Sequence, residues 1–174
     1  SSDLMSYLRS RDRVFDLAIM SEQIPVSLQA QRYYTRSMMK LLAETVENNG
    51  VLVYPLPFQE GYNSDHLVRL YKLIHHTLSD VFLYTRCVQG SSLYMMAANH
   101  PLNLPTRHRQ NMLEQNSYFT SDIFVSFQRQ TAFNEELREI QSPADVNTVG
   151  NLMSYKHGLI YVMDMSRSVM LHLY

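Results

Sequence analysis

Apolar residues recur at helical spacing along most of the chain. The clearest case is the segment 65–88, in which side chains three, four or seven positions apart stay apolar for about six turns. Asn63 and Ser64 precede this segment as capping residues, and Gln89 and Gly90 follow it. The spacing therefore predicts a long helix over 65–88, and its apolar positions are Leu67, Tyr71, Ile74, Leu78, Val81 and Val88.

The same spacing, bounded by capping residues, predicts further helices. A helix over 3–20 ends before Pro25, because proline disfavours helical backbone in the residue before it. A second helix covers 28–48 and is stopped by Asn49-Gly50. This Asn-Gly pair also suits a hairpin turn, but no alternating strand precedes it, so the helix stop is preferred. Shorter or weaker patterns predict helices over 93–99, 107–117 and 122–141.

Two segments do not follow the helical period clearly. Residues 51–62 are apolar and extended, and Pro55 and Pro57 argue against a central strand there. We expect a buried crossover with at most one short edge strand. The tail 151–174 fits a helix and a buried strand equally well, because Gly158 interrupts its apolar run.

These elements predict an all-α fold, or nearly so. The expected architecture is an irregular bundle of six or seven helices with the helix over 65–88 at its centre. The alternative adds one short strand pair between 51–54 and 159–163, since both segments are short and apolar. Residues 1–174 fit a single helical domain. The apolar end of the chain, 169–174, either docks into the core or marks a piece excised from a longer chain.

Composition narrows the class of protein. The chain is 45% hydrophobic and 18% charged with a net charge of −1, which excludes a disordered tail. Cys87 is the only cysteine, so neither an intramolecular disulfide nor a multi-cysteine zinc site can form. The longest apolar run lies near 159–163 and is too short to span a membrane. We therefore expect an intracellular protein, cytoplasmic or nuclear, that does not contact membranes.

One candidate binding surface is a stripe of cations on the helix predicted over 28–48. Arg32, Arg36 and Lys40 are four residues apart and therefore line one face of that helix. Tyrosines lie nearby, and basic residues interleaved with aromatic ones suit single-stranded nucleic acid. The alternative is an ordinary solvated face, with Lys40 paired to Glu44.

A second candidate is the proline-stiffened loop around 99–109. It presents Arg107, His108 and Arg109 together, and these side chains suit a phosphate, a carboxylate or a partner chain. The alternative is an exposed connector with a cluster of charges.

Histidines concentrate on the predicted helix over 65–88. His76 and Asp80 are one turn apart and share a face, whereas His75 points about 100° away. One helix thus supplies at most two ligands, and zinc needs three or four, so a surface pair is the simpler interpretation. Cys87 lies about 18 Å from His75 along a straight helix, which excludes a dyad and favours a small buried side chain.

The function classes follow from these features and from the missing catalytic motifs. No nucleophile elbow, P-loop or dinucleotide fingerprint is present, so the enzyme question stays open, leaning towards none, and no cofactor or metal is expected. We expect first a non-enzymatic helical assembly module, such as a capsid-like or scaffold subunit that binds a protein partner or itself. A helical nucleic-acid-binding domain is the second hypothesis, and an enzyme with a site at His75, His76 and Asp80 is the third.

Overall fold

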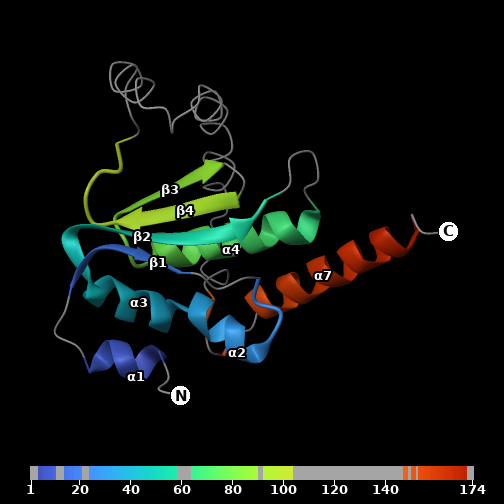
Figure 1. Ribbon diagram of the computed structural model, residues 1–174, viewed down its shortest axis with the longest axis horizontal. Helices are drawn as coiled ribbons and strands as arrows, with labels where there is room; N and C mark the ends of the chain where they lie inside the picture. The colour runs from blue at the N-terminus through green and yellow to red at the C-terminus, as the bar shows by residue number, and fades with distance from the viewer. Residues whose placement is uncertain are drawn as a thin grey trace, which may run out of the picture.

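The computed structural model describes residues 4–10, 14–20, 24–58, 64–89, 92–103, 147–148, 150–151 and 153–171, with side chains at the end of the last range described to 164. Helices alternate along the chain with the strands of one sheet (Figure 1). In chain order the elements are α1 (Leu4–Arg9), β1 (Phe15–Ile19), α2 (Leu28–Gln31), the 3₁₀ helix η1 (Arg32–Tyr34), α3 (Arg36–Thr45), β2 (Val46–Pro57), α4 (Asp65–Ser79), β3 (Tyr84–Gln89), β4 (Ser92–Ala98) and α7 (Met153–Leu171).

The centre of the fold is a four-stranded mixed sheet with the order β1-β2-β4-β3. Strand β1 runs parallel to β2, and the other neighbours are antiparallel. The fold is therefore α/β, and the expectation of an all-α bundle is wrong. The expected strand pair between 51–54 and 159–163 is also wrong, because 159–163 lies within α7. The helices expected over 107–117 and 122–141 lie outside the described residues.

The segment expected as one helix over 3–20 divides into α1 and β1. A parallel strand pair requires a long crossover, and here α2, η1 and α3 supply it between β1 and β2. The run from Phe15 to Ile19 is too short to show a helical or strand period by itself. Pairing with β2 decides its conformation, with Ala18 opposite Leu52 and Ile19 opposite Val53.

Strand β2 begins where the sequence predicted the end of a helix and contains Gly50. A Cβ atom on Gly50 would lie 2.7 Å from the carbonyl oxygen of Phe15, so glycine is needed for the close approach of β1. The prolines do not exclude β2 from the middle of the sheet. The Val53 carbonyl accepts from Met20 N–H at 2.9 Å, so the alternate residues Pro55 and Pro57 face the same side, beyond the last pair that β1 makes.

The long helix expected over 65–88 is correct only in its first part. Helix α4 begins at the cap Ser64, whose hydroxyl accepts from Leu67 N–H, and it ends at Ser79. The next apolar positions belong to β3, and the expected helix over 93–99 is β4. Residues in the two strands face each other in register, with Cys87 opposite Met95 and Thr85 opposite Ala97.

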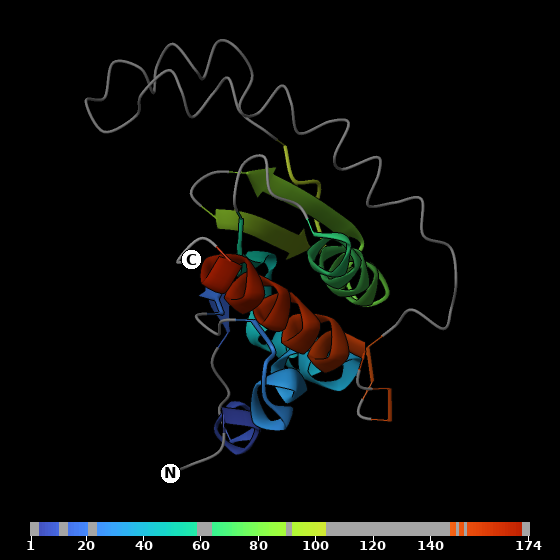
Figure 2. The same ribbon diagram turned by 90° about the vertical axis from the view of Figure 1, so that its right-hand side faces the viewer.

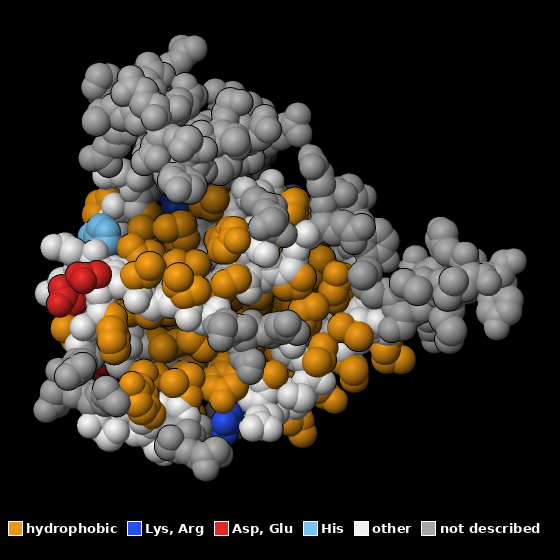
Figure 3. Space-filling model, viewed as in Figure 1, with side chains coloured by type: hydrophobic (Ala, Val, Ile, Leu, Met, Phe, Trp, Pro, Cys, Tyr) orange, Lys and Arg blue, Asp and Glu red, His pale blue; other side chains and the backbone are white. Residues whose placement is uncertain are grey.

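The hydrophobic core lies between the sheet and the layer formed by α3 and α4. The inward side chains of β2 and β4 alternate along each strand and pack on both helices. Figure 2 shows the helices on one side of β3 and β4. The opposite face of the sheet carries Leu17, Val51, Pro55, Tyr94 and Met96, and Figure 3 shows hydrophobic side chains over much of the side towards the viewer.

The ambiguous tail is a helix, α7, which packs on α4 and on α2. Its backbone comes so close to the chain before α2 that a Cβ atom on Gly158 would lie 3.0 Å from Ile24. At the seam with α4, the Nδ1 atoms of His66 and His157 lie 3.4 Å apart. Within the described residues, no helix is long and apolar enough to cross a membrane.

Candidate functional sites at the two edges of the sheet

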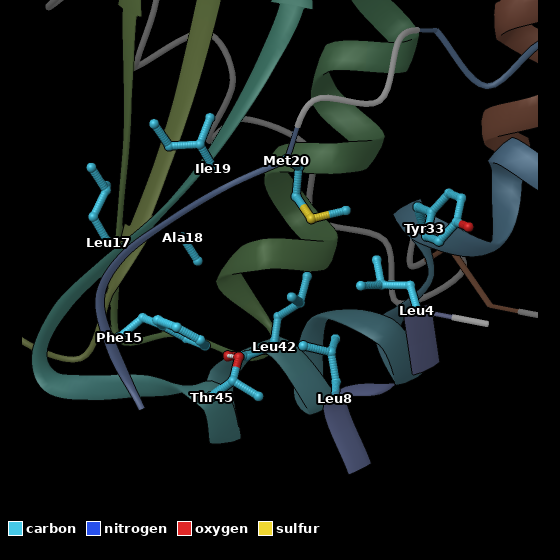
Figure 4. A pocket seen from close by; sticks show the side chains of 10 residues that line it. All are labelled: Leu4, Leu8, Phe15, Leu17, Ala18, Ile19, Met20, Tyr33, Leu42 and Thr45. Atoms are coloured by element: carbon cyan, nitrogen blue, oxygen red, sulfur yellow. Dashed lines mark hydrogen bonds between the residues drawn. The ribbon is translucent and has the colours of Figure 1, made fainter. Parts of the chain in front are cut away.

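A pocket of about 420 Å³ lies along the outer edge of β1, and we call it the β1 pocket (Figure 4). It forms because α1 and α3 pack on each other beside the strand, so their apolar side chains close the space under it. Ala18 and Met20 point towards these helices, while Leu17 and Ile19 point the other way. Its lining consists of Leu4 and Leu8 from α1, Phe15 and 17–20 at β1, Tyr33 from η1, and Leu42 and Thr45 from α3.

The β1 pocket contains few polar side-chain groups. The Thr45 hydroxyl donates to the Leu42 carbonyl at 2.8 Å, so towards the pocket it can only accept a hydrogen bond. The Tyr33 hydroxyl accepts from the Arg32 guanidinium at 2.9 Å and points away from β1. The pocket thus favours an apolar ligand, with one hydroxyl oxygen at its α3 end.

A second pocket, of about 320 Å³, lies at the opposite edge of the sheet, and we call it the β3 pocket. It is bounded by the last turns of α4, by the beginning of β3 and by the chain that follows β4. Its polar residues are His75, Ser79, Thr85, Arg86 and Asn103.

Three of these residues form a closed ring of hydrogen bonds, which includes the backbone carbonyl of His75. The Ser79 hydroxyl donates to the His75 carbonyl at 2.9 Å, so its bond to the Thr85 hydroxyl, also at 2.9 Å, uses the proton of Thr85. The 3.1 Å contact between Thr85 and His75 then requires Nε2–H of His75 as the donor. This order of donors leaves His75 no lone pair on Nε2 to activate either hydroxyl, so the ring is not a nucleophile–base pair.

Cys87 lies near this ring on β3 but takes no part in either pocket's lining. Its side chain is 1% exposed, and burial raises the pKa of the thiol to about 12. The prediction of a small buried side chain is confirmed.

The three cations predicted to line one face of the second helix do not form a continuous stripe, because two of them contact other side chains. The guanidinium of Arg32 lies 5.0 Å from the centre of the Tyr33 ring, and Arg36 forms an ion pair with Asp80. Lys40 is exposed on α3. Only Arg36 and Lys40 lie within α3, because the chain changes from η1 to α3 at Thr35. Binding of nucleic acid by these residues stays a prediction, and Arg107, His108 and Arg109 lie outside the described residues.

The histidine site expected at His75, His76 and Asp80 is not assembled. Asp80 pairs with Arg36 instead of His76, and His75 is buried against Thr85. Among the described residues, no group of three or more His, Cys, Asp or Glu side chains could hold a metal ion.

Comparison with known proteins identifies no family. No protein-family model matches the chain, and no curated protein matches it. A crystal structure of human methyltransferase-like protein 13 in complex with SAH aligns with a TM-score of 0.46 and 12% identity. The alignment covers 81% of this chain and 59% of that chain, so this chain spans less than two thirds of that protein.

The α/β architecture shows that the expected function, a helical assembly module, is wrong. A helical assembly module, capsid-like or scaffold-like, requires a helix bundle, and this chain has a mixed sheet with a parallel β-α-β unit instead. The same finding overturns the helical form of the nucleic-acid hypothesis.

Sequence analysis missed both pockets. Each is lined by elements distant in the chain, and the strands β1, β3 and β4 that bring them together had been predicted as helix. One signal was present: Thr85 and Arg86 interrupt an otherwise apolar run, at the position where β3 begins.

Proposed function

We propose that this domain binds a small, mostly apolar molecule in the β1 pocket. The observation that carries the proposal is the combination of size and lining. About 420 Å³ lies within the range of ligand-binding clefts, and such clefts are mainly apolar with few polar groups. Apart from Thr45 and the Tyr33 hydroxyl, the side chains that line the pocket are hydrocarbon and thioether.

The expected ligand follows from the polar groups that remain. The proton of Thr45 is committed to Leu42, so its oxygen accepts from a donor on the ligand. Among the described residues, no carboxylate, lysine or arginine lines the β1 pocket, so a charged ligand would lose its hydration without a compensating partner. An uncharged molecule with one hydroxyl or amine donor fits both conditions.

The test is binding of the uncharged dye Nile red, followed by its fluorescence, to the wild-type chain and to Ala18→Leu. The larger side chain fills space next to Leu42 and is expected to weaken binding about tenfold or more. Circular dichroism checks that the variant stays folded.

The matched control is Val51→Ser, which makes the opposite face of the sheet less apolar and leaves the pocket lining unchanged. We expect this variant to bind the dye as the wild type does. Binding that falls with Val51→Ser and not with Ala18→Leu would place the dye on the open face and overturn the proposal. SAH, bound by the methyltransferase-like protein, is the polar comparison, and displacement of Nile red by SAH would contradict an apolar ligand class.

We also propose an intracellular setting, cytoplasmic or nuclear. The single cysteine is buried and reduced in the fold, which gives no stabilisation by disulfides within the chain. Microscopy of the tagged full-length protein tests this location. A protein partner or self-association stays a prediction.

A further inference from the structure

The outer edge of β1 is apolar and has no partner strand among the described residues. Strand β1 is the first in the order β1-β2-β4-β3, so only its inner edge is paired. The side chains of Leu17 and Ile19 are 54% and 60% exposed. Asp16 is the only charged residue of β1, and the strand contains no lysine or proline. Natural edge strands usually carry such residues, because a free apolar edge pairs readily with another strand.

The backbone of β1 directs free hydrogen-bonding groups at this edge. Met20 N–H donates to the Val53 carbonyl at 2.9 Å, so the residues at even positions direct their backbone groups towards β2. The N–H and C=O groups of Leu17 and Ile19 therefore point outwards. The register with β2 shifts only between Phe15 and Leu17, so the backbone from Leu17 to Ile19 is regular and can form a further ladder.

The sequence of β1 suits pairing with a second copy of itself. In an antiparallel pair centred on Ala18, Leu17 lies opposite Ile19 of the second copy, and their free N–H and C=O groups bond to each other. Asp16 lies opposite Met20 of the second copy, so the two carboxylates do not meet. The net charge of −1 also opposes the association of two copies very little.

We propose that two copies of this chain associate through antiparallel pairing of their β1 strands about a two-fold axis at Ala18. One self-complementary edge then serves both copies, as in most closed dimers. The pairing extends the sheet across the dimer, and the side chains of Leu17 and Ile19, which point away from the helices, form one apolar row over the axis (Figure 4). This inference does not depend on a ligand in the β1 pocket.

Light scattering over a concentration series from about 1 μM to about 1 mM tests the association. We expect the mass to rise from one copy to two in the micromolar range, because the edge is short and the interface small. Ile19→Lys places a charge at the edge and should weaken the dimer about tenfold or more. Leu28→Lys is the matched control, because Leu28 is also 60% exposed but lies on α2, and this variant should dimerise as the wild type does.

A disulfide tests the register with a smaller change to the chain. In the proposed pair the two Ala18 Cα atoms are ~4.5 Å apart, so Ala18→Cys should form a covalent dimer under mild oxidation. Lys40→Cys, exposed on α3, should not, and the buried Cys87 leaves the wild type uncrosslinked. A mass of one copy at every concentration, equal effects of the two lysine variants, or equal crosslinking of the two cysteine variants would overturn the proposal.

Discussion

The two edges of the sheet offer opposite chemistry although they belong to one four-stranded layer. At β1, side chains from α1 and α3 border a space whose lining side chains are mainly apolar. At β3, the last turns of α4 bring His75 and Ser79 to Thr85. The difference arises from the helices, because both strands present short runs of mixed side chains at their edges.

This contrast shows how one fold can discriminate between ligand classes. The β1 pocket gains affinity mainly by removing apolar surface from water, at roughly 25 cal/mol per Å². The β3 pocket disfavours apolar ligands, because they would remove the Ser79 and Thr85 hydroxyl oxygens from water without giving them a partner. Each pocket therefore selects against the ligand that suits the other.

Gly50→Ala should separate β1 from β2 and produce the largest loss in the free energy of unfolding. The new methyl group would lie 2.7 Å from the Phe15 carbonyl oxygen, so β1 must move away from β2. We expect a loss of about 1–3 kcal/mol in the free energy of unfolding, measured by urea denaturation, together with loss of Nile red binding. Gly150→Ala is the control, because nothing lies within 4 Å of the position that its methyl group would take. Equal stability of the two variants would show that β1 does not approach β2 this closely.

Thr85→Val should damage the β3 edge alone. It keeps the side-chain shape but leaves Nε2–H of His75 and the Ser79 hydroxyl without their partner. The expected loss is about 1–2 kcal/mol in the same urea measurement, with Nile red binding at the β1 pocket unchanged. Thr85→Ser retains the hydroxyl and should recover most of the stability. If Thr85→Ser is as unstable as Thr85→Val, the ring contributes little.

Acidification tests the contact between α4 and α7 at His66 and His157, and we expect it to change the free energy of unfolding least. Burial lowers the pKa of His157 below its usual 6.5, and His66, Arg69 and Lys156 lower it further. The unfolded chain therefore takes up this proton first as the pH falls. This histidine leaves the free energy of unfolding unchanged above pH 6.5 and lowers it below that pH, by no more than about 1.4 kcal/mol per pH unit for one proton.

Urea denaturation between about pH 8 and pH 5 measures this slope. His157→Gln should flatten it, and His76→Gln, on the same helix as His66 but without an observed contact to His157, should not. An unchanged slope in His157→Gln would assign the acid sensitivity to other groups.

Local signals in the sequence were reliable where a single side chain decides the structure. Ser64 was predicted as a cap, and its hydroxyl accepts from Leu67 N–H at the start of α4. A cap acts within one turn, so its effect does not depend on the rest of the fold.

The choice between helix and strand was not decided locally. The expected continuation of the long helix through 84–88 and the expected helix over 93–99 are both wrong, since these segments pair with each other as β3 and β4. Short apolar runs fit a buried helix and a strand alike. Pairing partners outside each segment, such as Met95 for Cys87 and Ala97 for Leu52, provide the hydrogen bonds that settle the conformation.

By itself, the sequence determined the cap of α4, the burial of Cys87 and the apolar character of the segments that form the core. These properties depend on residue chemistry and on neighbours within one turn. Only the tertiary structure decided the order of the strands, the ion pair of Arg36 with Asp80, and the two pockets. The physical reason is that each of these joins residues far apart in the chain, and their contact energies exist only after the sheet and its helices have packed.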